Sequence, residues 1–337
     1  MRRLNFVLAL VCIPLLTRFC FGEDRPGALD PDSTRSEVPM SEEGSLFNVP
    51  SPTLGGRQFW GDVTFRQGWR IQQNVFTEHF RLLDASDTRR AWGTREACQK
   101  VLDDQRLPAT TGEAVVFVHG IIRSSKSFDD LQRATRDAGF AVIPFDYPST
   151  RVSISDGAKF LTEVLDSLQG VEQIHFVVHS MGGLVVRNAL KEPKPQWKLG
   201  RMVMLGVPNQ GAQMANIMQD NILYKFLYGP AGQELVADPA GFIAKLPAPP
   251  MEFAVIAGAR GTPDGWNPLI PGDDDGTVSV EATALPGAAD FMTVPALHSF
   301  MMSHPAVQSS TLHFLRTGAL HKDSPRQPIP IPVAPAP

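Results

Sequence analysis

Hydrophobic positions change their spacing along the chain near residue 112. Before that point, residues 57–65, 69–72 and 79–83 alternate polar with β-branched or aromatic positions, which predicts β-strands. A helix is predicted over residues 95–104. We expect the antiparallel strands of this first part to form one edge of a larger sheet.

From residue 112 onwards, short runs of consecutive apolar residues alternate with amphipathic segments. Each run has the length and continuity of a strand that is buried on both faces. The runs are 114–118, 140–145, 174–178, 202–206, 253–257 and 291–294. The helices between them are predicted at 128–138, 154–168 and 183–190. This alternation predicts an α/β fold in which helices flank a mostly parallel central sheet.

The two ends of the chain lack this periodicity. Residues 23–55 are rich in Pro, Ser and acidic residues and are expected to form a flexible arm. Residues 321–337 contain six prolines and are expected to form a Pro-rich, disordered tail. One α/β domain then spans residues 56–320. Within it, residues 213–250 interrupt the strand–helix rhythm and predict either a small helical lid or two ordinary helices packed on the core.

Residues 1–22 have the features of an export signal. Arg2 and Arg3 precede an apolar run at residues 6–16, which is too short to span a bilayer comfortably. The expected location is therefore periplasmic or extracellular, after cleavage of the signal peptide. Because Arg18 follows the apolar run closely, an uncleaved membrane anchor is the alternative.

Composition limits the possible functions. With 31 Lys and Arg against 35 Asp and Glu, the formal net charge is −4, which excludes a strongly basic nucleic-acid binder. Cleavage after residue 22 would leave 315 residues, a net charge of −7, and Cys98 as the one remaining cysteine. A single cysteine cannot close an intramolecular disulfide, so the mature protein is expected to be stabilised by packing.

The strongest chemical signal is the segment 179–183, His-Ser-Met-Gly-Gly, which joins a predicted strand to a predicted helix. A serine in such a turn is typical of a nucleophile elbow, in which the residues around the serine must be small. Gly182 and Gly183 meet this need after Ser180, whereas Val178 stands where the Gly-x-Ser-x-Gly pattern has its first glycine. The alternative is a serine that only caps a helix.

With this motif, the sequence resembles the α/β-hydrolase family, and within it the bacterial triacylglycerol lipase and esterase group. The resemblance covers about residues 112–316. It implies an α/β-hydrolase fold with a catalytic serine, acid and base that follow one another in this order along the chain. The residues that match this order are Ser180, Asp275 and His298.

The acidic residue is expected in the turn-rich loop 272–278. Members of the family commonly place it at the start of an Asp-Gly-x-Val segment, and Asp275 begins such a segment here. Asp275 is therefore preferred to Asp274 and Asp273. A solvated acidic turn and a calcium site formed by the three carboxylates are the alternatives, although adjacent side chains point in different directions.

The resemblance also implies a base and two oxyanion donors. His298 follows the last predicted strand, 23 residues after the expected acid, and is the implied general base. The nearest rival is His304, which lies beside a proline at the start of the final helix. The family places one oxyanion donor after a His-Gly pair, here residues 119–120, which implies the backbone N–H groups of Ile121 and Met181.

Apolar residues near these positions are candidates for the substrate-binding surface, since a Gly-x-Pro-x-x-Gly segment and the possible lid would adjoin the serine. The candidates are Ile122, Val207, Leu223, Phe226 and Leu227. They would suit an ester or lipid-like small molecule. The sequence has no Walker loop, His-Glu-x-x-His segment or Cys pair at ligand spacing, so neither a cofactor nor a metal is expected. No stable transmembrane span is expected in the mature chain, and the sequence specifies no oligomeric state.

The sequence therefore predicts a serine hydrolase of carboxylic esters, a lipase or esterase that works through an acyl-enzyme. An acyltransferase or a thioesterase could use the same three residues. A serine peptidase and a non-catalytic binding protein with this fold are further alternatives, and the complete Ser–Asp–His set argues against the latter.

Overall fold

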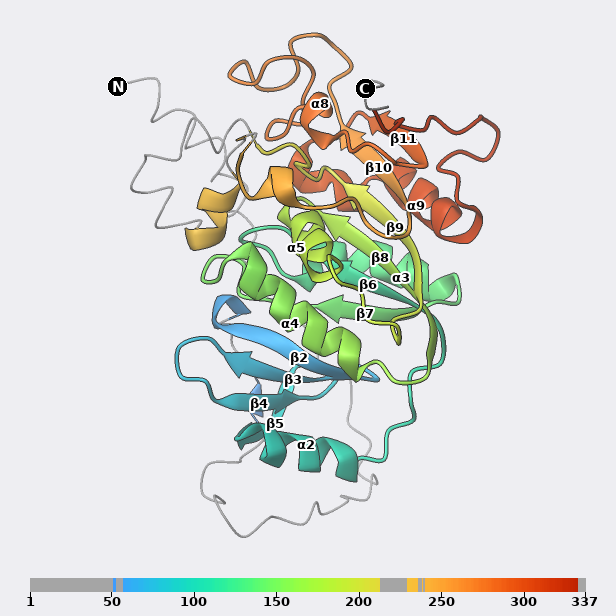
Figure 1. Ribbon diagram of the computed structural model, residues 1–337. Coiled ribbons are helices and arrows are strands. Elements are labelled where there is room, and N and C mark those ends of the chain that lie inside the picture. Colours follow the sequence, from blue (N-terminus) through green and yellow to red (C-terminus); the bar gives the residue numbers. More distant parts are fainter. Residues whose placement is uncertain (1–50, 53–56, 213–228, 236–237, 239, 333–337) are drawn as a thin grey trace, which may run out of the picture. The chain divides into compact units, whose positions relative to one another are not determined.

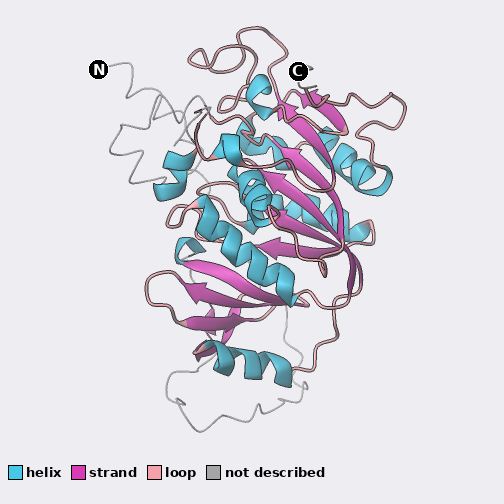
Figure 2. Cartoon of the chain, viewed as in Figure 1, coloured by secondary structure: helices cyan, strands magenta, loops and turns pink. Residues whose placement is uncertain are grey.

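Two β-sheets organise the part of the chain that the structure describes (Figures 1 and 2). The structure is a computed structural model and describes residues 51–52, 57–212, 229–235, 238 and 240–332. The expected export signal and the arm lie outside these residues, except Ser51–Pro52, which pair with a later strand. Among the described residues, no helix has both the length and the apolar character needed to cross a membrane.

The first sheet is antiparallel and has the strand order β1-β5-β4-β3-β2. Its strands are β1 (Ser51–Pro52), β2 (Trp60–Arg66), β3 (Trp69–Asn74), β4 (Phe80–Leu83) and β5 (Thr88–Gly93). A 3₁₀ turn, η2 (Arg57–Phe59), precedes β2, and helix α2 (Arg95–Asp104) packs against β4 and β5. Helix α2 buries Cys98, and this burial raises the pKa of the thiol to about 12.

The second sheet has six strands, all parallel, in the order β11-β10-β9-β8-β6-β7. Its strands are β6 (Gly112–Val118), β7 (Ala141–Phe145), β8 (Val171–His179), β9 (Leu199–Leu205), β10 (Glu252–Gly258) and β11 (Asp290–Val294). The parallel sheet confirms the α/β class that the apolar runs predict.

Helices cover both faces of the parallel sheet. Helices α4 (Ile154–Ser167) and α5 (Met181–Ala189) contact each other in front of the sheet in Figure 1, and α4 also covers β2. Helices α3 (Asp129–Asp137) and α9 (Pro305–Thr317) contact each other behind it. The remaining turns are α8 (Val280–Thr283), η3 (Ser125–Phe128), η4 (Ile243–Lys245) and η5 (His298–Ser303).

The core fixes where the strands end. Val115, Val177, Val203 and Ile256 of neighbouring strands are fully buried in one apolar cluster, together with Phe314 of α9. Such a cluster holds the strands in register, because a shift by one residue would turn each apolar side chain to the other face. The loops after the carboxyl ends of β6, β8, β10 and β11 therefore gather at one edge of the sheet, where parallel α/β folds place their sites.

The antiparallel strands form a separate sheet, so our expectation that they extend the parallel sheet was wrong. At the junction of β2 with the edge strand β7, the N–H of Asp62 donates to the carbonyl of Asp146 at 2.9 Å. In return, the N–H of Asp146 donates to Asp62 Oδ2 at 2.7 Å. Strand β7 contains Pro144, which has no N–H group to contribute to a further ladder. The two sheets thus meet where Asp62 and Asp146 exchange two hydrogen bonds.

The described part of the tail, residues 321–332, corrects the expectation of disorder. Gly287 donates its N–H to Ile329 O at 2.8 Å, and Ile329 donates to Ala288 O at 3.0 Å. Arg326 also pairs with Glu252 at 2.8 Å. These contacts hold the segment against the loop before β11.

The described part of the expected lid is in contact with the main domain. Residues 229–234 are helical, and Glu234 accepts the N–H of Ile154, at the start of α4, at 2.6 Å. Arg187 of α5 donates to the carbonyl oxygens of Leu246 and Pro247. The second half of this insertion is thus anchored to α4 and α5.

Close backbone approach at the elbow predicts a large cost for Gly182→Ala. A Cβ atom there would lie 2.3 Å from Val118 O and 2.7 Å from His119 O, and backbone oxygens cannot rotate away. We expect a loss of about 2–3 kcal/mol in the free energy of unfolding, measured by urea denaturation. The matched control is Gly157→Ala in α4, where the new Cβ would meet the Tyr147 ring at 3.1 Å and should change stability by less than about 1 kcal/mol. Equal stabilities of the two variants would contradict the close packing at the elbow.

Candidate active site

Ser180 occupies a sharp turn between β8 and α5. Its backbone angles are φ 55° and ψ −132°, a region that non-glycine residues rarely adopt and that stores strain. The turn is fixed by the Ser180 N–H, which donates to Leu205 O at 2.9 Å, and by the Ser180 carbonyl, which accepts from the Gly183 N–H at 3.0 Å. Val178 is fully buried in β8, so the elbow forms without the first glycine of the usual pattern.

His298, the first residue of η5, lies between Ser180 and Asp275. Its Nε2 atom is 2.9 Å from Ser180 Oγ, and its Nδ1 atom is 2.6 Å from Asp275 Oδ2. A carboxylate only accepts, so Nδ1 carries the proton and Nε2 is left to accept the serine hydroxyl. All three residues are at most 9% exposed. This arrangement can move a proton from the serine to the imidazole.

The Asp275 carboxylate is oriented by its own loop. Its Oδ1 atom accepts the N–H groups of Thr277 at 3.0 Å and Val278 at 2.8 Å, which leaves Oδ2 for the histidine. The Asp275 carbonyl accepts the N–H of His298 at 2.9 Å, so side chain and backbone both join the two loops. These contacts are made by Asp275 and not by its two neighbours.

Asp273 and Asp274 have other partners. Asp273 accepts the N–H groups of Arg260 and Gly261, and Asp274 accepts those of Asn267 and Gly276. The three consecutive carboxylates therefore do not converge on one point. Within the described ranges, no three His, Cys, Asp or Glu side chains form a group suited to a metal ion.

Gly206 supports the site and was not identified from the sequence. It has φ +55°, and a Cβ atom on it would lie 3.1 Å from His298 Nδ1 and 3.2 Å from Asp275 Oδ2. A side chain here would press on the hydrogen bond between these two residues. The signal in the sequence was its place at the head of a Gly-x-Pro-x-x-Gly segment, but the spacing does not show which atoms it would meet.

His179 holds the backbone of the candidate base. Its Nε2–H donates to His298 O at 3.0 Å, and the two ring centroids are 4.6 Å apart. Complete burial, with further contributions from His298 and Arg123, lowers the pKa of His179 well below its usual value. His179 therefore stays neutral and acts as a hydrogen-bond donor to the loop.

The expected oxyanion donors lie close to the serine. A Cβ atom added to Gly120 would come within 2.9 Å of Ser180 Cβ, so the loop after β6 packs directly against the nucleophile candidate. Within the described part of the chain, neither the N–H of Ile121 nor that of Met181 donates a hydrogen bond to the protein. Met181 also begins α5, where the helix dipole favours negative charge.

The residues that the sequence suggests for the substrate surface occupy different environments in the structure. Ile122 is half-buried in the loop after β6. Val207 is fully buried, and its side chain would lie 2.5 Å from a Cβ atom at Gly183. Val207 therefore packs beneath the elbow, and its assignment to the substrate surface was wrong. Leu223, Phe226 and Leu227 lie outside the described residues.

Other apolar side chains lie exposed near the candidate base. Leu297 and Phe300 are 40% and 53% exposed and flank His298 in the chain. Trp266 and Leu269 are also exposed, on a loop that Asn267 anchors to Asp274 and to the carbonyl of Gly276. The sequence analysis missed these residues, because exposure at a loop tip leaves no periodic pattern.

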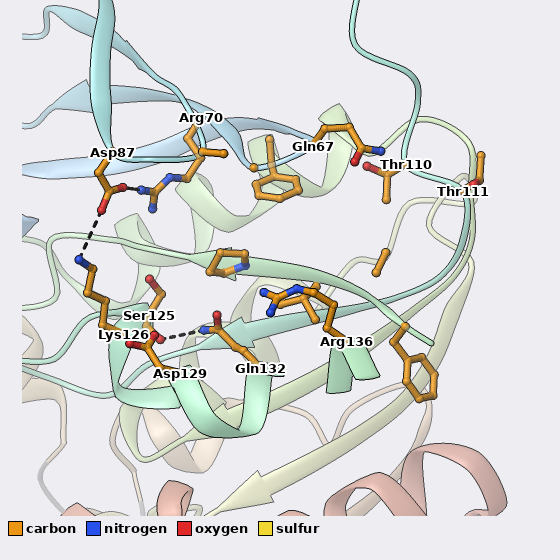
Figure 3. A pocket seen from close by; sticks show the side chains of 17 residues that line it. Gln67, Arg70, Asp87, Thr110, Thr111, Ser125, Lys126, Asp129, Gln132 and Arg136 are labelled. Carbon is orange, nitrogen blue, oxygen red and sulfur yellow. Dashed lines mark hydrogen bonds and ion pairs between the residues drawn. The ribbon is translucent and has the colours of Figure 1, made fainter. Parts of the chain in front are cut away.

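A cavity of about 570 Å³ lies between strands β2 and β3 on one side and α3 and β7 on the other (Figure 3). Arg70 pairs there with Asp87, which also pairs with Lys126 at 3.5 Å (Figure 3). Ser180, Asp275 and His298 are not among its lining residues. This cavity is therefore separate from the candidate active site.

The sheet order, the elbow after β8 and the order Ser180, Asp275, His298 together define the α/β-hydrolase fold. The resemblance noted in the sequence is confirmed at this level. A family model described as "Domain of unknown function (DUF7379)" matches residues 79–240, which include the serine but not the expected acid or base.

A comparison with known proteins found a relative that is named as a thioesterase. A segment of 105 residues is 30% identical to lysosomal thioesterase PPT2-B of Xenopus laevis. This match covers 29% of the chain and 36% of the relative, so it spans about a third of that protein.

Among solved structures, the chain is similar to a lipase, BlEst2, from Bacillus licheniformis. For its mature form the TM-score is 0.49 at 20% identity, over 63% of this chain and 93% of that one. For its propeptide form the match covers 56% of this chain and 47% of that one, with a TM-score of 0.47 at 20% identity. Phospholipase PlaB from Legionella pneumophila gives a TM-score of 0.49 at 17% identity, over 63% and 60% of the two chains.

Asp275 and Asp274 bind different partners, so removal of their charges should have different effects on kcat. In Asp275→Asn the amide cannot stabilise a cationic His298, so we expect kcat for a chromogenic ester to fall roughly 10³–10⁴-fold. Asp274→Asn removes the charge from a carboxylate that accepts the backbone N–H groups of Asn267 and Gly276, whereas His298 binds Asp275, so kcat should stay within about 10-fold of wild type. The reverse order of effects would move the acidic role to Asp274.

Proposed function

We propose that this protein is a serine hydrolase of carboxylic esters that works through an acyl-enzyme on Ser180. The observation that supports it best is the buried hydrogen-bond chain from Ser180 Oγ through His298 to Asp275, with distances of 2.9 and 2.6 Å. A serine hydroxyl is a weak nucleophile unless an adjacent base removes its proton. The strained turn at Ser180 presents the hydroxyl to that base.

In the acylation step, His298 Nε2 takes the Ser180 proton as Oγ attacks the ester carbonyl. The negative charge that forms on the carbonyl oxygen is stabilised by the N–H groups of Ile121 and Met181, each of which can contribute about 3 kcal/mol in a water-poor site. Asp275 stays ionised and stabilises the imidazolium. The tetrahedral intermediate collapses, and His298 returns the proton to the alcohol that leaves.

In the deacylation step, water replaces the alcohol. His298 accepts a proton from the water as it attacks the acyl carbonyl, and the same two N–H groups bind the second oxyanion. Collapse of this intermediate breaks the bond to Ser180 Oγ, which receives the proton from His298. The products are the carboxylic acid and the free serine.

Exposed apolar side chains favour an ester with an apolar acyl chain. Leu297 and Phe300 flank His298, and Trp266 and Leu269 occupy the loop anchored by Asp274. Contact with such side chains would contribute about 25 cal/mol of binding free energy for each Å² of apolar acyl surface that is removed from water. We therefore propose lipid-like esters as the substrate class.

Ser180→Ala provides the direct test of the nucleophile. Because the variant lacks Oγ, it should show no measurable turnover of p-nitrophenyl esters above the solution rate, and a fluorophosphonate probe should no longer label the protein. Thr135→Val is a control that removes another buried hydroxyl, which donates to Leu131 O within α3. Labelling that persisted in Ser180→Ala would show that a different residue reacts.

A thioesterase activity is the second candidate, because the 105-residue match is to a lysosomal thioesterase. Oxyesters and thioesters with the same acyl chains separate the two, since a thiolate leaves with little help from an acid whereas an alkoxide needs the proton of His298. We expect kcat/KM to rise with acyl length and to stay within about 10-fold between oxyester and thioester of equal length. A preference of more than about 100-fold for thioesters would replace the ester assignment.

A further inference from the structure

The loop after β6, residues 119–125, carries the expected oxyanion donor and is held by residues from outside the parallel sheet. Gln58 of η2 donates from Nε2 to Arg123 O at 3.1 Å. Its Oε1 atom accepts from the N–H of Thr150 at 3.0 Å and from Ser149 Oγ at 3.2 Å. Ser149 Oγ in turn accepts the N–H of Ile122 at 3.1 Å. One glutamine thus joins the C-terminal side of the turn around Ile121 to the loop of Ser149 and Thr150.

Asp146, at the end of β7, holds the other side of the loop. Its carboxylate accepts the N–H of Ser125 at 2.6 Å and the Ser125 hydroxyl at 2.9 Å. Its side chain is almost fully buried, and its Oδ1 atom lies 3.7 Å from His119 Nε2. The two ends of the loop therefore lie against the same carboxylate.

Strands β2 and β3 of the antiparallel sheet fix Asp146. Arg70 Nη1 donates to Asp146 Oδ2 at 2.9 Å, and Asp62 Oδ2 accepts the Asp146 N–H at 2.7 Å. Gln72 donates to the other Asp62 oxygen at 2.7 Å and accepts from Arg81 Nε at 2.9 Å. Each of these side chains is at least 90% buried.

The charge of Arg70 favours the ionised form of Asp62. Burial raises the pKa of Asp62, Arg70 lowers it and the neighbouring Asp146 raises it, and the net result is a pKa of about 6. Without the guanidinium, two buried carboxylates would face each other. Their mutual repulsion would then act on Asp146, which binds Ser125.

His119 and Tyr147 connect the residues around Asp146 to the peptide groups before Ile121. His119 Nδ1–H donates to Gly120 O at 2.8 Å, and the Tyr147 hydroxyl donates to His119 O at 2.9 Å. The rings of His119 and Tyr147 stack with centroids 4.5 Å apart. The peptide groups on the N-terminal side of Ile121 are thus tied to the residue after Asp146.

We propose that the antiparallel sheet and the turn η2 before it position the oxyanion hole, with Gln58, Asp62 and Arg70 acting as positioning residues that hold the Ile121 N–H toward Ser180. This inference rests on the proposed ester hydrolysis. An oxyanion exists only in the transition state and the tetrahedral intermediates, so a displaced donor lowers kcat and leaves KM nearly unchanged. A misplacement of about 1 Å at such a donor can cost roughly 100-fold in rate.

The test compares Gln58→Ala and Arg70→Met with Gln73→Ala in the full-length protein. Gln73 lies on β3, and its side chain makes no hydrogen bond to any described residue, so it is a matched control on the same sheet. The rates are expressed per active site, counted by fluorophosphonate titration, so that a loss of folded protein does not count as a loss of kcat. Arg70→Lys tests rescue, because one ammonium can reach Asp146 but cannot also bind Asp87 as the guanidinium does.

We expect kcat to fall about 10-fold in Gln58→Ala and roughly 10–100-fold in Arg70→Met. The kcat of Arg70→Lys should lie between those of Arg70→Met and wild type. KM should stay within about 2-fold of wild type in all variants. The inhibition constant of an alkyl boronic acid, which forms a tetrahedral adduct on a serine, should rise by the same factors. If wild type hydrolyses esters but all variants keep the kcat and boronate affinity of Gln73→Ala, the positioning role is refuted. Wild-type protein that neither hydrolyses esters nor binds the boronate would instead refute the proposed function.

Discussion

The backbone of Ser180 is held in a conformation that an L-residue rarely adopts, and the rest of the site depends on this turn. Such strain persists only when the surroundings define the chain path completely. Here the N–H of Ser180 is bound to β9, while Gly120 and Gly182 allow the loop after β6 to approach without side chains in between. The turn therefore exists because three adjacent strands end at the same level.

The same convergence brings together groups that are far apart in the chain. His298 follows Ser180 by 118 positions and Asp275 by 23, yet one imidazole bridges both side chains. Each contact is supported by a second one, because Asp275 also binds the His298 N–H and His179 binds the His298 carbonyl. Pre-organisation of this kind reduces the reorganisation that a reaction would require.

The sequence predicted the fold where local patterns reflect burial. The apolar runs match the six parallel strands, and the predicted helix 154–168 agrees with α4 to within one residue. The predicted start of the next helix at 183 was late, because α5 begins at Met181, directly after the strained serine. Asp275 could be chosen among three aspartates only through its Asp-Gly-x-Val segment, and the structure brings this residue to His298.

The remaining features depend on contacts between distant segments that no local pattern records. Asp62 and Arg70 are charged, so exposed positions are expected for them. Both are buried because each forms a hydrogen bond with Asp146. Val207 is apolar, as a substrate contact would be, and it packs under Gly183 instead. The tail is rich in proline and nevertheless binds the loop before β11 through backbone groups.

A crystal structure of the protein with a phosphonate ester bound covalently tests the proposed site most directly. The phosphorus should be bonded to Ser180 Oγ, and one phosphonyl oxygen should lie about 2.7–3.1 Å from the backbone nitrogens of both Ile121 and Met181. His298 should remain hydrogen-bonded to Asp275. An adduct on another residue, or a phosphonyl oxygen directed away from both nitrogens, would contradict the assignment of the nucleophile and the oxyanion hole.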